Sequence, residues 1–294
     1  MKKQSTATVF LLFGTLLWGM TFAFIKDAMA SLSAFDFLFW RFGIASLFLF
    51  LVFFKKINLT DGKLIRQGIW LGLFLAGTVI FQTMGLRYTS ASTASFITGL
   101  SVILVPLYFT VVQKQWPEMN IMVAVALTVT GIALISLNSA LSVNIGDFWI
   151  ILCAISFAVY IILAGKFSQS GQAITLTFVQ SLTITFVVGF INVGGGSYTF
   201  PTQINLWVDI LFCAIFASVL AFYLQIRFQH YITATKTALI FALEPVFATL
   251  TAIAYLHEEL TTRFVIGALC IFAGMLLSEF KFKRKLDRPD RVVS

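Results

Sequence analysis

Long apolar stretches dominate this chain and limit what it can fold into. Ten of them follow one another, each close to the ~20 residues that a helix needs to cross the hydrocarbon core of a membrane. A spanning segment must satisfy its backbone hydrogen bonds internally, so each stretch is predicted to be a helix. The predicted spans are residues 7–25, 35–54, 68–86, 93–112, 119–137, 147–165, 173–193, 206–226, 236–256 and 264–280.

The composition fits lipid as the surrounding solvent. Of the 294 residues, 59% are hydrophobic and 11% are charged, whereas soluble domains carry about 25% charged residues. The linkers between the spans are too short to form a separate soluble domain. We therefore expect an all-α integral membrane protein, with one transmembrane domain over residues 1–280 and a basic tail over residues 281–294.

The positive charges predict how the chain is oriented in the membrane. With the N-terminus in the cytoplasm, 16 of the 20 Lys and Arg residues fall on the cytoplasmic side. The four on the other side are Lys26, Arg41, Arg87 and Arg263. This bias follows the positive-inside rule and predicts a multi-pass protein of the cytoplasmic (inner) membrane with both termini in the cytoplasm. The basic tail is expected to lie against anionic headgroups.

The N-terminal segment allows a second interpretation. Lys2 and Lys3, an apolar run, and the sequence Ala28-Met29-Ala30 resemble a cleavable signal peptide. The apolar run has ~19 residues, however, against ~7–15 in such peptides. Cleavage would also leave the second half of the chain without a complete partner, so a retained first span is favoured.

The second half of the chain repeats features of the first at an offset of 143 residues. Gln82 matches Gln225, Tyr88 matches Tyr231, and Gly131 matches Gly274. The repeats cover residues 7–137 and 147–280, with five spans each. Since five is odd, the second repeat enters the membrane in the opposite orientation, an arrangement known from transporters that hold substrate near the midplane.

Several short motifs resemble those of EamA-type members of the drug/metabolite transporter superfamily. They are Leu17-Trp18-Gly19, Arg41-Phe42, Gly85-Leu86-Arg87-Tyr88-Thr89-Ser90-Ala91, Leu243-Glu244-Pro245-Val246 and Glu258-Glu259-Leu260-Thr261. The resemblance implies ten transmembrane helices around a central cavity and export of amino acids, other small metabolites or drugs. The first repeat departs from the closing motif, because Gln115 stands where the second has Glu259.

Glu244 is the only carboxylate well inside a predicted span. An ionisable group at such a depth is costly unless it is paired or faces water, and this makes it a functional candidate. Pro245 follows it and can kink the helix beside the acid. Arg41, in the second span, is predicted to pair with Glu244. We expect these three residues to act in gating or ion coupling; a structural Glu244 and an Arg41 that snorkels to the headgroups are the alternatives.

A weakly polar, aromatic cavity is predicted around Glu244. Such a lining suits amphipathic organic molecules, which bind through apolar area and a few orienting hydrogen bonds. The alternative for each residue is packing between helices. The candidate substrate-binding residues are Trp18, Thr21, Phe22, Thr78, Gln82, Phe96, Tyr160, Tyr223 and Glu244.

Other chemistry has little support in the sequence. Cys153, Cys213 and Cys270 stand alone in separate spans, so neither a metal site nor a cofactor is expected. No phosphate-binding GxxxxGK[ST] motif occurs, so ATP is not the expected energy source. The expected partners are a small-molecule substrate, the lipid bilayer and protons, with no nucleic acid. The chain is expected to act as a monomer or a homodimer.

These observations favour a secondary transporter that exports an amino acid or a related amphipathic compound by alternating access. A gradient-independent facilitator or exchanger, or an uptake permease of the same fold, is the alternative. A membrane-embedded enzyme is disfavoured, because the only polar cluster, His257 with Glu258 and Glu259, belongs to a family loop motif.

Overall fold

The structure, a computed structural model, describes residues 2–112, 119–136, 144–195, 199–232, 237 and 240–279. Every regular element in these ranges is a helix. Seven helices are long and apolar enough to cross a membrane, and three shorter apolar helices accompany them. The expectation of an all-helical membrane protein is therefore confirmed. Gln115 and the basic tail lie outside the described residues.

The first half contains α1 (Lys2–Ala28), α2 (Ala34–Phe53), α3 (Gly62–Leu86), α4 (Ala91–Thr98), α5 (Ser101–Val112) and α6 (Met119–Ser136), with a 3₁₀ turn, η1 (Phe54–Lys56), after α2. Polar caps begin several of these helices. The Ser33 side chain accepts a hydrogen bond from the Asp36 amide, and the Asp61 carboxylate accepts from the amides of Lys63 and Leu64. Such caps satisfy amide donors that have no partner within the helix.

The second half contains α7 (Ile145–Phe167), α8 (Ala173–Gly195), α9 (Ile204–Phe212), α10 (Phe222–Phe228), α12 (Glu244–Leu256) and α13 (Thr262–Glu279). Short turns are η2 (Ser168–Ser170) and η4 (Gln229–Tyr231). A nine-residue π-helix, η3 (Cys213–Ala221), joins α9 to α10, so the three form one continuous rod. π-Helical segments are rare and are frequent at functional sites.

Two of the predicted spans are interrupted near their middles. Turns at Gly99 and Leu100 separate α4 from α5, and turns at Ala242 and Leu243 precede α12. Pro245 lies in the first turn of α12, where its missing amide hydrogen costs nothing. The structure thus has a break just before Glu244, in place of the kink that the sequence suggested at the proline.

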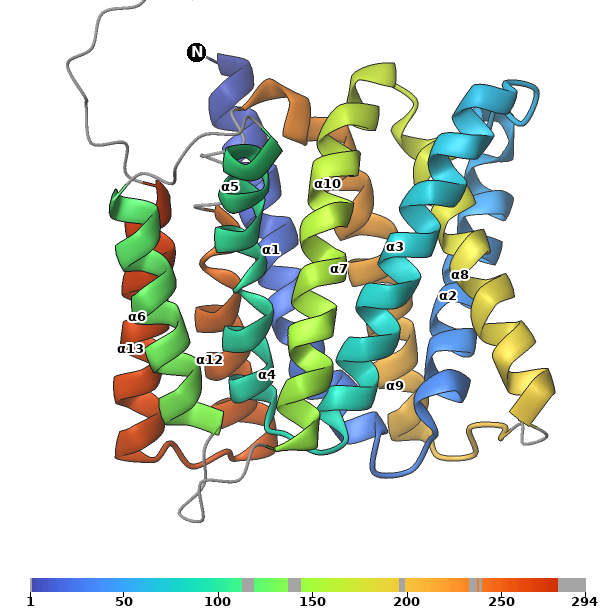
Figure 1. Cartoon of the computed structure of the whole chain (residues 1–294). Coiled ribbons are helices and arrows are strands. Elements are labelled where there is room, and N and C mark those ends of the chain that lie inside the picture. The colour runs from blue at the N-terminus through green and yellow to red at the C-terminus, as the bar shows by residue number, and fades with distance from the viewer. Residues whose placement is uncertain are drawn as a thin grey trace, which may run out of the picture.

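The helices stand roughly parallel to one another in a bundle (Figure 1). α6 and α13 pair at one edge, and α2 and α8 pair at the other. α1 begins at the end of the bundle that carries the N-terminus, which we call the N-terminal face; α7 begins at the opposite end, the far face. The turns around residues 29–33, 87–90 and 257–261 lie at the far face.

Small residues allow the helix backbones to approach closely, as is common in membranes. A Cβ atom on Gly131 of α6 would lie 2.5 Å from the carbonyl oxygen of Gly267 in α13. Gly72 of α3 is similarly close to Thr183 of α8, where a Cβ would meet the Thr183 side chain at 2.5 Å. The α6–α13 and α3–α8 contacts therefore depend on the absence of a side chain.

We expect Gly131→Leu to destabilise the protein by about 2 kcal/mol, because overpacking a tight contact costs ~1–3 kcal/mol. Thermal unfolding in detergent measures the change. Gly194→Leu is the matched control, since nothing lies within 4 Å of a Cβ at Gly194. Equal unfolding temperatures for the two variants would contradict the close contact.

Candidate functional site

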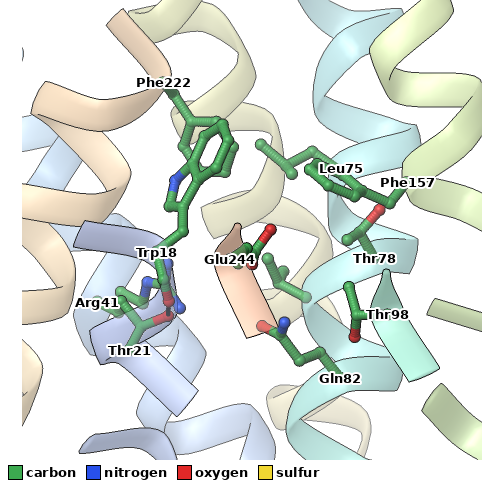
Figure 2. Close-up of a pocket in the computed structure, with 11 residues that line it drawn as sticks. Trp18, Thr21, Arg41, Leu75, Thr78, Gln82, Thr98, Phe157, Phe222 and Glu244 are labelled. Carbon is green, nitrogen blue, oxygen red and sulfur yellow. Dashed lines mark hydrogen bonds between the residues drawn. The ribbon is translucent and has the colours of Figure 1, made fainter. Parts of the chain in front are cut away.

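A small polar chamber lies in the middle of the bundle (Figure 2). Its volume is about 30 Å³, enough for little more than a single water molecule. It draws side chains from both halves of the chain. The lining residues are Trp18, Thr21, Arg41, Leu75, Thr78, Val79, Gln82, Thr98, Phe157, Phe222 and Glu244.

Two ionisable side chains, a guanidinium and a carboxyl, line the chamber. Arg41 is 2% exposed; its Nε donates a 2.8 Å hydrogen bond to Ser218 Oγ in η3, and its Nη1 has no hydrogen-bond partner. Glu244 is 8% exposed and lies between the side chains of α1 and those of α3 (Figure 2). No ion pair joins the Arg41 and Glu244 side chains within the described residues, so the predicted pair is not formed. The Arg41 guanidinium is hydrogen-bonded to Ser218 instead.

The threonines of the chamber offer oxygen acceptors. The Thr21 hydroxyl donates to the Trp18 carbonyl at 2.6 Å, and the Thr78 hydroxyl donates to the Phe74 carbonyl at 2.9 Å. Each hydroxyl hydrogen is thus used within its own helix, and the oxygen lone pairs remain for a ligand. Gln82, one turn beyond Thr78, adds an amide with both donor and acceptor capacity.

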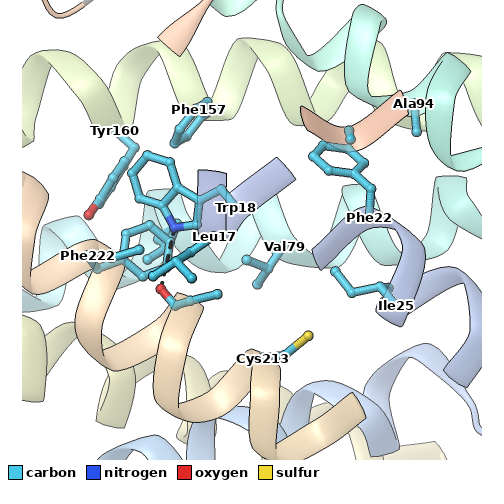
Figure 3. Close-up of a cluster of buried hydrophobic side chains, with 14 of the residues drawn as sticks. Leu17, Trp18, Phe22, Ile25, Val79, Ala94, Phe157, Tyr160, Cys213 and Phe222 are labelled. Carbon is cyan, nitrogen blue, oxygen red and sulfur yellow. Dashed lines mark hydrogen bonds between the residues drawn. The ribbon is translucent and has the colours of Figure 1, made fainter. Parts of the chain in front are cut away.

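An aromatic layer covers the chamber on the side of the N-terminal face. The Trp18 ring centroid lies 5.1 Å from that of Phe222, 5.4 Å from that of Phe241 and 6.0 Å from that of Phe157. The Trp18 Nε1 hydrogen is satisfied by the Ala217 carbonyl at 3.4 Å (Figure 3). Trp18 is therefore fixed at its polar edge and packed on its faces.

A much larger vestibule lies beyond this layer, toward the N-terminal face. Its volume is about 660 Å³, within the range of small-molecule sites. Phe241 lines the vestibule and also packs on Trp18, so the aromatic layer separates the vestibule from the chamber. The vestibule residues are Val102, Val105, Ile161, Ile162, Gly165, Lys166, Gln169, Gln229, His230, Ile232, Thr237 and Phe241.

At the far face, a contact that we call the Glu258 latch joins the two halves of the chain beside a cavity of about 220 Å³. Glu258, in the turn between α12 and α13, accepts hydrogen bonds from the Ala91 amide at 2.7 Å and from the Ser92 hydroxyl at 2.6 Å, both at the start of α4. The Ser92 amide donates to the same carboxylate at 3.2 Å. Hydrogen bonds to a carboxylate are about twice as strong as neutral ones, so the latch ties α4 firmly to the second half.

Comparison with known proteins agrees with this helical membrane architecture. The EamA-like transporter family model matches the chain twice, over residues 5–137 and 144–280. The chain belongs to this family. It is therefore a multi-pass membrane transporter of the drug/metabolite transporter superfamily, as its motifs predicted.

Its relatives include an uncharacterized transporter of Archaeoglobus fulgidus, 34% identical over 89% of this chain and 82% of that protein. The uncharacterized transporter YcxC of Bacillus subtilis is 25% identical over 98% of this chain and 97% of its own length. A solved crystal structure shares the fold with a TM-score of 0.69, at 16% identity, over 93% of this chain and 96% of that one.

The structure of this EamA-like transporter brings six of the predicted side chains into the chamber. They are Trp18, Thr21, Arg41, Thr78, Gln82 and Glu244. Five others lie outside its lining. Phe22 is fully buried in the core, Phe96 packs edge-on against Phe264, Tyr160 donates to Gln180, Tyr223 packs on the core, and Pro245 starts α12.

The chamber contains residues that the sequence prediction missed. Leu75 and Val79 share the helix face of Thr78 and Gln82, so their spacing of three and four residues could have identified them. Phe222 takes the place predicted for Tyr223. Phe222 and Tyr223 are neighbours at the start of α10, so their depth in the span could not separate them.

We expect Trp18→Ala to join the chamber to the vestibule. In a background without native cysteines, a cysteine at Thr78 should react about tenfold faster with a water-soluble thiol reagent once Trp18 is truncated. A cysteine at Lys166, which is exposed in the vestibule, should react quickly in both backgrounds. Unchanged labelling at Thr78 would show that Trp18 is not the barrier.

We expect Glu258→Ala to release the far face. Losing a helix cap costs ~1 kcal/mol, which corresponds to several-fold more opening at that face. Labelling from the far side measures this opening at a cysteine in place of Ala94, which is fully buried in α4 and makes no bond to Glu258. Glu259→Ala is the control, since Glu259 is an exposed neighbour in the same turn. An equal effect of both substitutions would rule out a specific latch.

Proposed function

We propose that this transporter moves a small zwitterionic metabolite, an amino acid or a related amphipathic compound, out across the cytoplasmic membrane by alternating access. The two halves, residues 7–137 and 147–280, act as inverted repeats of five spans that rearrange around the chamber. The presence of Arg41, with an unpartnered Nη1, and Glu244 in one chamber carries this proposal.

The contacts between helices support the repeat. α3 packs on α7 and α8, and the α9–α10 rod packs on α1 and α2 in the same way. α1 packs on α12, as α7 packs on α4 and α5. The interruptions at Gly99 and Ala242 are 143 residues apart, as are the residues matched in the sequence. A pseudo-twofold relation between the halves accounts for all three correspondences.

The charges in the chamber support a zwitterion as substrate. The free Nη1 of Arg41 can donate to a carboxylate, which guanidinium groups bind with good geometry. The Glu244 carboxyl, once ionised, can accept a hydrogen bond from an ammonium group. An α-amino acid carries both charged groups on one carbon, so it could satisfy both side chains at once.

The apolar walls support an amphipathic side chain on that substrate. Leu75, Val79 and Phe157 supply apolar parts of the chamber lining. At about 30 Å³ the chamber is too small for an amino acid in this conformation, so loading requires the aromatic layer to move. Induced closure and opening of this kind is common where binding must exclude water.

Export is the direction that the open vestibule favours. The vestibule, of about 660 Å³, lies at the N-terminal face, where most Lys and Arg residues gather. At the opposite face the cavity is smaller, about 220 Å³, and the Glu258 latch holds the two halves together. The positive-inside rule predicts that the N-terminal face is cytoplasmic. In that orientation, substrate would enter the vestibule from the cytoplasm in this conformation.

Substrate analogues test the two charges separately. We expect Arg41→Gln to weaken L-phenylalanine binding at least tenfold, because a hydrogen bond to a charged group contributes ~1.5–3 kcal/mol. Phenethylamine, which lacks the carboxylate, should bind both proteins equally. Glu244→Gln should weaken L-phenylalanine and phenethylamine alike, but not hydrocinnamate, which lacks the amine.

Ligand-induced thermal stabilisation of the purified protein measures these affinities, and counterflow in proteoliposomes measures transport. Glu259→Gln is the control for loss of an acidic side chain. Thermal stabilisation by hydrocinnamate but not by L-phenylalanine would contradict the zwitterion site. Binding of L-phenylalanine that neither Arg41→Gln nor Glu244→Gln weakens would contradict it as well.

A further inference from the structure

A second acidic site lies at the far face, away from the chamber. Asp209 is in α9, Asp27 is near the end of α1, and Tyr255 is near the end of α12. The Tyr255 hydroxyl lies 3.4 Å from Asp27 Oδ2 and 3.5 Å from Asp209 Oδ1. Two carboxyl groups from distant parts of the chain therefore converge on one hydroxyl, which can donate its hydrogen to only one of them.

Asp209 is fully buried, and its second oxygen, Oδ2, has no hydrogen-bond partner. Its surroundings are aromatic: the Phe24 ring packs 4.4 Å from that of Phe212 and 4.9 Å from that of Tyr255. A charged carboxylate in such a place is costly without a cation, and two neighbouring carboxylates cannot both ionise cheaply. A proton on the pair removes one negative charge and supplies the missing donor.

Nearby cations are engaged elsewhere. Lys26, next to Asp27, donates its Nζ hydrogen to the Leu86 carbonyl at 2.8 Å, and Arg41 donates to Ser218. In the described part of the chain no ion pair is formed by Asp209. The ionisable groups on the elements around it at this level are Asp27 and Lys26 of α1, Asp36 and Arg41 of α2, Cys213 of η3 and Tyr255 of α12.

We propose that Asp209, Asp27 and Tyr255 form a proton-binding site that exchanges its proton with the solution at the far face. Asp27 and Tyr255 are partly exposed there and give the buried Asp209 a route to water. A metal cation is a poorer occupant, because hard cations take about six or more oxygen ligands and this cluster offers few.

The position of the site links it to the chamber. Asp209 lies one turn before Cys213, where the π-helix η3 begins; η3 carries Ser218, the partner of Arg41, and leads to Phe222. A change of charge on Asp209 thus acts on the same rod that positions two chamber groups. The coupling of Asp209 to transport rests on the proposed transport function. The existence of the proton-binding site does not depend on that function.

Infrared spectroscopy of the purified full-length protein tests the site without a substrate. In a Glu244→Gln background, which removes the chamber carboxyl, we expect a carbonyl band of a protonated carboxylic acid. Asp209→Asn should abolish this band, Tyr255→Phe should shift its frequency, and Glu259→Gln should leave it unchanged. A band unaffected by Asp209→Asn, or one abolished by added Na⁺ at constant pH, would overturn the proposal.

Proteoliposomes test the coupling. With radiolabelled L-phenylalanine as probe, Asp209→Asn and the milder Asp27→Asn should reduce accumulation driven by a pH gradient about tenfold and leave counterflow intact. Full gradient-driven accumulation in both variants would refute the coupling role. Absence of counterflow in the unmodified protein would refute the proposed function instead, and the infrared result would still decide the proton site.

Discussion

A buried guanidinium organises the centre of this bundle. In hydrocarbon, a charged arginine is costly unless it finds partners or water. Arg41 has one strong hydrogen bond, to Ser218, and that partner comes from the π-helix η3. The widened helix supplies the hydroxyl and also directs Phe222, rather than Tyr223, toward the chamber. The polar and aromatic sides of the chamber therefore depend on the same local departure from α-helical geometry.

Close backbone packing frames this centre. At the edge of the bundle, Gly131 meets Gly267 and Ile271, and Gly274 meets Ala124 and Thr128. These two sets of contacts correspond at the repeat offset of 143 residues. Tight contact through small residues depends on shape and makes few strong bonds, so it holds helices together and still allows them to slide. The far face differs, since the Glu258 carboxylate adds directed hydrogen bonds there.

Hydrophobicity along the sequence was sufficient to predict an all-helical membrane protein, because lipid leaves a spanning backbone no alternative, but not the interruptions within two of the predicted spans. The chamber residues that are polar or unusual at their depth, such as Arg41 and Glu244, were also predictable. Among the aromatic residues, Trp18 lines the chamber as predicted, but Phe22, Phe96 and Tyr160 do not, and their apolar rings could not be told apart by residue type from those that do.

The two mid-span interruptions, at Gly99–Leu100 and Ala242–Leu243, have a consequence for leakage. An unbroken helix moves as a lever, so opening one end would also disturb the seal at the other. A helix divided at its middle lets the segment on each side tilt independently. Under the proposed alternating access, this division allows a conformation sealed at both ends, in which no continuous path for ions crosses the membrane.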